Sequence, residues 1–281
     1  MMSPRPSFGD PSPLRSAAWV RFFGRVMARH MRAHFHAVRI AKPGVSVLPA
    51  DTPVVIYCNH PSWWDAALVS VLATSVFAER KSYGPIDADA IKKYGFMRRI
   101  GFFGVQPNSR AGAVTVLRVG RALLAHADTL LWITPEGAFT DPRSRPLAMR
   151  PGLASLLVRV PRVAVIPLAI EYPFWTERTP EALVRFGAPL YLDVTRPMAA
   201  QELHQLLERN LGDLMDALAE DAMSKDASRF VTLFTGTSGV GGVYDAWRRA
   251  KAWASGRHFD PAHAADLPPL AAQPGQASTN R

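Results

Sequence analysis

Short apolar runs alternate with helical stretches along most of this chain, and this alternation constrains its fold more than any other feature. The runs lack regular polar alternation, which is typical of strands buried on both faces of a sheet. The helical stretches between them suit the crossover connections of parallel strands. The expected strands are Val54–Cys58, Phe102–Val105, Leu130–Ile133, Val163–Glu171 and Leu183–Phe186, and the expected helices are Trp63–Phe77, Ala111–His126, Gly152–Arg159 and Ala199–Met223. We therefore predict a single α/β domain with a mostly parallel, mixed sheet flanked by helices.

The segment before this domain is strongly basic. Between Pro11 and Ala50 there is no acidic residue. A helical wheel of residues 17–39 separates an apolar side from a basic side. The apolar side holds Trp19, Val20, Phe22, Phe23, Val26 and Met27, and the basic side holds Arg21, Arg25, Arg29, Arg32, His36 and Arg39. This predicts a basic amphipathic helix that either lies in a membrane interface or packs on the domain with a solvated back. The lack of acidic residues favours the membrane, because solvated faces usually mix both signs.

These patterns divide the chain into four segments. Residues 1–14 are proline-rich and residues 255–281 are rich in Ala, Pro and Gly, so we expect both to be disordered. Residues 15–45 are the expected membrane-interface helix, and residues 46–254 are the expected folded domain.

The charge balance narrows the possible partners. Lys and Arg total 33 against 23 Asp and Glu, a formal net charge of +10, which favours anionic partners. The sequence shows no nucleic-acid-binding motif, so we expect an anionic membrane surface and no nucleic acid. There is no uninterrupted apolar run of 18 residues, so no spanning helix is expected. The single cysteine, Cys58, is expected to be a buried core residue.

The first chemical motif follows the first expected strand, in residues 59–65, Asn-His-Pro-Ser-Trp-Trp-Asp. Functional groups gather at the carboxyl ends of strands in α/β sheets, and His60 stands there. With Ser62 as an expected helix N-cap, Asp65 falls in the first helical turn, from which its carboxylate reaches back to the imidazole. This pair suits base-assisted attack by an alcohol: imidazole takes the proton, and the carboxylate fixes its tautomer. A loop histidine and an unrelated helix-capping aspartate would give the same spacing.

The second motif is Pro135-Glu136-Gly137, directly after the expected strand Leu130–Ile133. Alone, it is an ordinary turn. Together with residues 59–65, it resembles the glycerolipid acyltransferases, the lysophosphatidic-acid acyltransferase family. That family carries Asn-His-x4-Asp after a strand, then Pro-Glu-Gly, then an apolar strand with a central proline, which residues 163–170 resemble. The resemblance covers roughly residues 50–190 and implies a glycerol-3-phosphate acyltransferase-like fold.

The resemblance also implies roles for individual residues. His60 would be the general base and Asp65 its partner. Glu136 and Gly137, with Pro135 in the same turn, would hold the glycerol or phosphate end of a lipid acceptor. The co-substrate would be acyl-CoA or acyl-ACP, and neither a metal nor another cofactor is implied.

Two departures concern arginines. The family usually continues Pro-Glu-Gly with Thr-Arg-Ser, whose arginine is taken to bind phosphate, but Phe139 stands in that place here. The family also has an arginine closing a middle motif, where this chain has Gln106 and Pro107. Guanidinium groups bind phosphate through paired charge-assisted hydrogen bonds. The candidates for such contacts, each alternatively a solvated surface residue, are Arg110, Arg143 and Arg145.

The leading hypothesis is an acyltransferase for a lysophospholipid such as lysophosphatidic acid, peripheral on the cytoplasmic face of the cytoplasmic membrane. The altered arginines leave a second hypothesis open, an acyltransferase for an amino lipid or a glycosylated or polyisoprenoid lipid. A third is a non-catalytic basic protein that binds membrane or nucleic acid.

Overall fold

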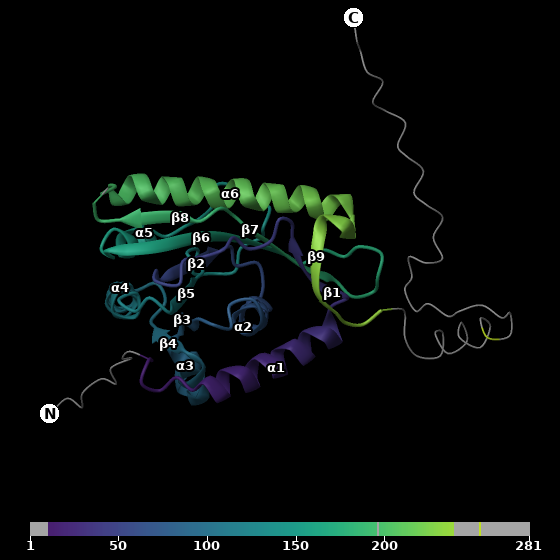
Figure 1. The fold of residues 1–281 in the computed structure, drawn as a ribbon, viewed down its shortest axis with the longest axis horizontal. Helices are drawn as coiled ribbons and strands as arrows, with labels where there is room; N and C mark the ends of the chain where they lie inside the picture. Colours follow the sequence, from purple (N-terminus) through teal and green to yellow (C-terminus); the bar gives the residue numbers. More distant parts are fainter. Residues whose placement is uncertain (1–10, 196, 239–252, 254–281) are drawn as a thin grey trace, which may run out of the picture.

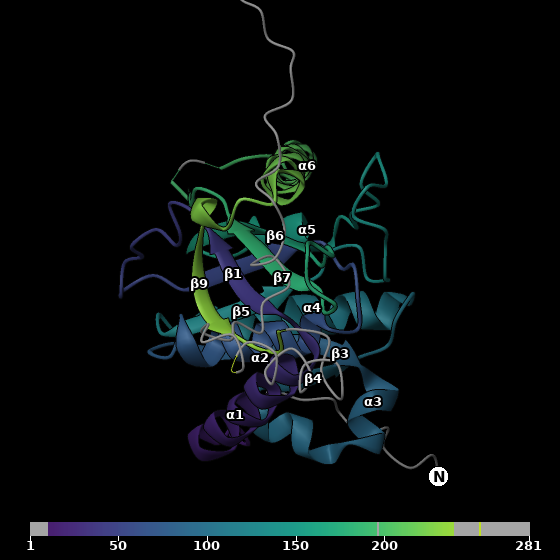
Figure 2. The same ribbon diagram turned by 90° about the vertical axis from the view of Figure 1, so that its right-hand side faces the viewer.

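A computed structural model describes residues 11–195, 197–238 and 253. The described part has three layers, with a twisted sheet between two layers of helices (Figure 1). Helix α6 lies on one side of the sheet and helix α1 on the other in both ribbon views (Figures 1 and 2). The predicted α/β fold with a mostly parallel, mixed sheet is confirmed.

Nine strands form the sheet within the described residues. Their order is β4 (Phe102–Val105), β3 (Lys81–Asp87), β5 (Thr129–Ile133), β2 (Val54–Cys58), β6 (Arg162–Glu171), β7 (Glu181–Phe186), β1 (Ala37–Ala41) and β9 (Phe230–Thr235), with β8 (Leu190–Asp193) paired to β6. The run from β4 to β6 is parallel, and β7, β8 and β9 each form an antiparallel pair. The centre of the sheet is therefore a parallel block with β2 between β5 and β6.

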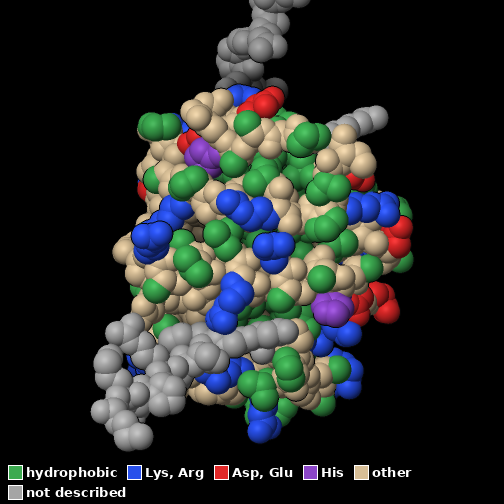
Figure 3. Space-filling view, turned by 90° about the vertical axis from the view of Figure 1, so that its left-hand side faces the viewer, with side chains coloured by type: hydrophobic (Ala, Val, Ile, Leu, Met, Phe, Trp, Pro, Cys, Tyr) green, Lys and Arg blue, Asp and Glu red, His purple; other side chains and the backbone are tan. Residues whose placement is uncertain are grey.

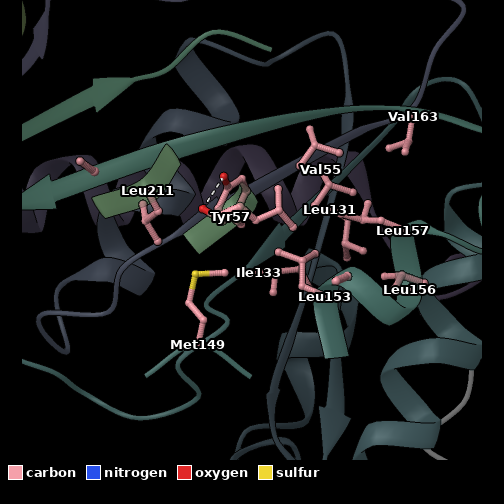
Figure 4. Close-up of a cluster of buried hydrophobic side chains, with 14 of the residues drawn as sticks. Val55, Tyr57, Leu131, Ile133, Met149, Leu153, Leu156, Leu157, Val163 and Leu211 are labelled. Atoms are coloured by element: carbon pink, nitrogen blue, oxygen red, sulfur yellow. Dashed lines mark hydrogen bonds between the residues drawn. The ribbon is translucent and has the colours of Figure 1, made fainter. Parts of the chain in front are cut away.

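Strand β2 shows why an unbroken apolar run suits this position. Val55 and Tyr57 enter one core cluster, while Val54, Ile56 and Cys58 enter the cluster on the opposite face. The Tyr57 hydroxyl donates to the Leu207 carbonyl of α6 (3.1 Å), so even its polar end is satisfied (Figure 4). A strand buried on both faces needs apolar side chains in both directions.

The helices divide between the two cores. Helices α4 (Arg110–Leu123), α5 (Gly152–Leu157) and α6 (Ala200–Ser224) contribute to the cluster around Tyr57. Helices α1 (Ala17–His34) and α2 (Asp65–Ser75) contribute to the other. The remaining helical segments are short, namely α3 (Ala88–Lys93), η1 (Gly95–Ile100) and η2 (Ala227–Arg229).

The helix expected over residues 17–39 is too long. Helix α1 ends at His34, Phe35 is extended, and residues 37–41 form β1 inside the sheet. Arg39 is therefore not on a solvated helix face: it is buried, and its Nε donates to Glu181 Oε2 at 2.9 Å. The helical-wheel prediction was wrong beyond His34 because residues 37–41 have high β-propensity. Their pairing with β7 and β9 in the sheet is favoured over continuation of the helix.

Helix α1 shows features of both alternatives that the sequence left open, packing on the domain and an exposed apolar surface. Gly24 packs on α2 so closely that a Cβ there would lie 2.4 Å from Thr74 Oγ1. Trp19, Phe22 and Val26 nevertheless remain exposed. The helix is thus docked on the domain and still presents an apolar stripe to solvent.

Several elements escaped prediction, among them β3, β8 and β9. Strand β3 contains Gly84 and Pro85, which interrupt the apolar pattern, and β8 is only half buried. Conversely, the predicted tail 255–281 and most of the predicted lead-in 1–14 lie outside the described residues.

The described surface is rich in basic side chains. Figure 3 shows Lys and Arg spread among hydrophobic side chains across one face, with acidic side chains mainly near its margins. No described helix combines the length and apolarity required to cross a membrane.

Candidate active site

The site lies where three neighbouring strands end. Strands β5, β2 and β6 are parallel and adjacent, so their carboxyl ends meet at one edge of the sheet. Glu136 follows the end of β5, His60 follows the end of β2, and Tyr172 follows the end of β6. This edge is where α/β folds usually place functional groups.

His60 is held at this edge by side-chain and backbone contacts. Asn59 clamps the loop to β6, because its amide donates to the Ile170 carbonyl (2.9 Å) and accepts from the Ile170 N–H (2.8 Å). The His60 N–H donates to Glu136 Oε2 at 2.9 Å, and the His60 carbonyl accepts from the Thr140 N–H at 3.0 Å. The loop therefore has little freedom to move the imidazole.

The imidazole and Asp65 form a hydrogen-bonded pair, with 2.6 Å between His60 Nδ1 and Asp65 Oδ2. The side chain of His60 is 24% exposed, whereas that of Asp65 is almost completely buried. With Nδ1–H donated to the carboxylate, Nε2 carries the lone pair, and it has no hydrogen-bond partner among the described residues. This arrangement is competent for general-base chemistry.

Asp65 lies in the first turn of α2, as expected, but the helix begins at Asp65 itself and Ser62 is not the N-cap. The N-cap is Trp64, which makes no side-chain capping bond. The Ser62 N–H instead donates to Asp65 Oδ2 at 3.2 Å. The carboxylate thus binds the loop that precedes the helix, and the positive end of the helix dipole favours its charge.

Tyr172 completes the surroundings of the carboxylate. Its hydroxyl donates to Asp65 Oδ1 at 2.7 Å. Burial and the neighbouring Asp65 charge hold the pKa of the Tyr172 phenol well above its usual value, so it remains a donor. Sequence reasoning missed this residue, although its position directly after a buried strand was an available signal.

The second motif forms a tight turn against the first. The Gly137 N–H donates to the Thr134 carbonyl (3.1 Å), and Gly137 adopts a positive φ of 65°. Pro135 is buried, and its carbonyl accepts from the Arg150 N–H (2.9 Å). Burial raises the pKa of Glu136, while the hydrogen bond from the His60 N–H opposes that rise. Glu136 thus faces the histidine loop.

Phe139, which stands where the resemblance has an arginine, lies beside the histidine. The centroids of the Phe139 and His60 rings are 4.5 Å apart. The Phe139 side chain is 60% exposed. The exposed Phe139 ring therefore places an apolar group beside the imidazole of His60.

The three predicted arginines are spread around the site. Arg110 is the first residue of α4, as expected, and is exposed. Arg143 makes two side-chain hydrogen bonds to Asp141 (2.9 and 2.7 Å) and is 88% exposed. Arg145 pairs with Asp216 of α6. The charges of Arg143 and Arg145 are thus matched by acidic residues.

Arg150 was not a sequence candidate, yet it lies against the second motif. Its Nη2 donates to Asn108 Oδ1 (2.6 Å) and, more weakly, to the Gly137 carbonyl (3.5 Å). No motif pointed to it, because it is separated from Gly137 by a long loop and reaches back only in the folded chain.

The described residues contain no group of three or more His, Cys, Asp or Glu side chains placed to hold a metal ion. Cys58 is fully buried beneath the site, and burial raises the pKa of its thiol well above the usual value. It therefore behaves as a core residue.

Comparison with known proteins places both motifs in one family domain. Residues 39–171 match the family model described as Acyltransferase. None of the curated proteins matches the chain in sequence. The fold is similar to the crystal structure of the 1-acyl-sn-glycerophosphate (LPA) acyltransferase, PlsC, from Thermotoga maritima, with a TM-score of 0.52 and 14% identity, covering 72% of this chain and 79% of that chain.

Proposed function

We propose that this chain, whose residues 39–171 match the family model described as Acyltransferase, moves a fatty acyl group from a thioester to a hydroxyl of a lysophospholipid such as lysophosphatidic acid. The donor in this proposal is acyl-CoA or acyl-ACP. The observation that carries it is the 2.6 Å hydrogen bond between His60 Nδ1 and Asp65 Oδ2, with no hydrogen-bond partner for Nε2 among the described residues.

The reaction that suits this pair is direct transfer. The acceptor hydroxyl gives its proton to His60 Nε2 while its oxygen attacks the thioester carbonyl carbon. The new C–O bond forms, the C–S bond breaks, and the departing thiolate takes the proton from the imidazolium. General-base assistance of this kind typically contributes about 10²–10⁴-fold.

The surroundings of the pair support this chemistry by keeping it rigid. Asp65 accepts three hydrogen bonds, from His60 Nδ1–H, the Ser62 N–H and the Tyr172 hydroxyl. Glu136 fixes the backbone of His60 from the other side. A preorganised base avoids reorganisation during the reaction, which is a major source of enzymatic rate enhancement.

The proposal includes docking on an anionic membrane surface, on the cytoplasmic face of the cytoplasmic membrane. Helix α1 exposes Trp19, Phe22 and Val26 beside a set of exposed arginines. These arginines are Arg21, Arg25, Arg29 and Arg32. Aromatic side chains beside basic ones are typical of helices that lie in a membrane interface. Replacing Trp19, Phe22 and Val26 with serine should release the protein from anionic vesicles, and unchanged sedimentation with vesicles would contradict this part.

One observation favours a second acceptor class. Phe139 puts an exposed aromatic ring, rather than a cation, beside His60. This suits an acceptor that carries no phosphate near the reacting hydroxyl, such as an amino lipid or a glycosylated or polyisoprenoid lipid.

The test is acyl transfer from a thioester to a panel of lysophospholipids and other lipid alcohols. Wild type and His60→Ala are compared with His126→Ala, which removes an exposed histidine outside the site. We expect loss of at least 10²-fold in His60→Ala only, since the general base is missing. Equal transfer by His60→Ala would overturn the proposal, and so would a folded wild type that transfers to no acceptor while still binding membranes. A neutral lipid as best acceptor would select the second class.

A further inference from the structure

Arg150 is a cation at the site and has no acidic partner among the described residues. Within that part of the chain, its side-chain hydrogen bonds run from Nη2 to Asn108 and to the Gly137 carbonyl. The hydrogens on its Nε and Nη1 therefore remain available to a ligand. Arg143 and Arg145 differ in this respect, because each pairs with a carboxylate.

Gly137 makes the position of the Arg150 guanidinium possible. A Cβ on Gly137 would lie 2.8 Å from Arg150 Cζ, 3.0 Å from Nε and 3.1 Å from Nη1. The three nearly equal distances mean that the guanidinium lies over the α-carbon of Gly137. Any other residue there would displace it, besides being strained at a φ of 65°.

Asn108 holds the guanidinium from a second loop. It follows β4 and adopts a positive φ of 54°, and its Oδ1 accepts from Arg150 Nη2 at 2.6 Å. The backbone N–H of Arg150 is tied to the Pro135 carbonyl. Arg150 is thus fixed at both ends although its side chain is exposed, which lowers the entropic cost of binding a ligand.

The same turn connects this cation to the catalytic pair. Glu136 binds the His60 N–H, and Gly137, the next residue, lies beneath the guanidinium. A ligand on Arg150 would therefore lie one short turn from His60. The Nε and Nη1 hydrogens at the edges of this exposed guanidinium can each donate a charge-assisted hydrogen bond to an oxyanion.

We propose that Arg150, positioned by Asn108 over Gly137, binds the phosphate group of the acyl acceptor and so sets the preference for phosphate-bearing lipids. This inference rests on the proposed acyl transfer and adds the residue that determines acceptor specificity. The other source of phosphate is the CoA part of the donor, and the experiment separates the two.

The kinetic test uses two acceptors with the same acyl chain, lysophosphatidate and monoacylglycerol, and two donors, acyl-CoA and an acyl thioester of N-acetylcysteamine, which lacks phosphate. For Arg150→Ala, we expect kcat/KM with lysophosphatidate to fall at least tenfold with either donor, and with monoacylglycerol to stay within twofold, because only one acceptor offers the oxyanion. Arg150→Lys should recover part of the loss, since lysine keeps the charge but not the planar fork. Arg121→Ala, which removes an exposed arginine near the C-terminal end of α4, is the matched control.

A loss that is equal for the two acceptors, or that disappears with the phosphate-free donor, would overturn the assignment to the acceptor. Binding of glycerol 3-phosphate to His60→Ala, with and without Arg150→Ala, is measured alongside. If wild type transfers no acyl group but this binding depends on Arg150, the proposed function fails and the phosphate site stands. If transfer proceeds and neither rate nor binding responds to Arg150, the phosphate site fails alone.

Discussion

Replacing Asp65 with asparagine tests whether its charge, rather than its shape, supports His60. An asparagine oxygen in the place of Oδ2 still accepts from His60 Nδ1–H and from the Ser62 N–H. Its amide then faces the Tyr172 oxygen, which changes from donor to acceptor. The structure can thus accommodate asparagine with its hydrogen bonds reorganised, and only the negative charge is lost.

The size of the effect follows from Coulomb's law. Two unit charges about 4 Å apart interact by about 4 kcal/mol at an effective dielectric constant near 20. Since about 1.4 kcal/mol corresponds to a factor of ten in rate, complete imidazolium formation in the transition state would be worth roughly 10³-fold. Proton transfer is partial in the transition state, so we expect Asp65→Asn to lower kcat by roughly 10²–10³-fold, with little change in thermal stability.

Asp65→Ala is the contrasting variant. It leaves three donors without an acceptor, in a site where Asp65 is 2% exposed. Each unsatisfied buried donor costs about 1–3 kcal/mol, so the free energy of unfolding should fall by several kcal/mol, unlike in Asp65→Asn. The assay follows release of the free thiol from the thioester donor, and urea unfolding measures stability. Wild-type turnover by Asp65→Asn would refute the electrostatic argument, and equal destabilisation of the two variants would refute the hydrogen-bond argument.

Three further predictions concern Tyr172, Glu136 and helix α1. Tyr172→Phe removes one hydrogen bond to the Asp65 carboxylate. We expect kcat to fall about tenfold at unchanged KM, measured by steady-state kinetics, and the free energy of unfolding to fall about 1–2 kcal/mol, measured by urea unfolding. An unchanged kcat would contradict this prediction. The raised pKa of Glu136 means that the native state binds the carboxyl proton more tightly than the unfolded state does. The contribution of Glu136 to the free energy of unfolding is therefore largest at low pH. It falls as pH rises from 4.5, the ordinary pKa of a glutamate, through the raised pKa of the native state. Glu136→Gln keeps an acceptor and should gain melting temperature relative to wild type as pH rises from 4 to 8, and a difference independent of pH would argue against this linkage. Gly24→Leu should separate α1 from α2 and cost about 1–3 kcal/mol, with faster proteolysis of α1 as the readout, whereas wild-type resistance would show that the contact is dispensable.

The central sheet and the hydrogen-bonded pair of His60 and Asp65 could be predicted because local sequence carries both. Strands β2 and β6 are buried on both faces and must be apolar throughout, which distinguishes them from their surroundings. His60 and Asp65 are near neighbours across one strand-to-helix turn, so their contact depends on a few backbone angles. Strand β1 was misread because the alternation of basic and apolar residues fits a helix wheel, and only pairing with β7 and β9 decides its form.

The sequence by itself determined the layered α/β fold, the edge of the sheet that carries the site and the pairing of His60 with Asp65, because periodicity and short-range spacing are local properties. Only the tertiary structure decided which other groups reach that pair. Tyr172 follows β6 and binds Asp65. Arg150 lies at the far end of a long loop and contacts Asn108 and Gly137. Contacts between residues far apart in the chain depend on how strands are ordered and how loops close, and no local pattern encodes that order.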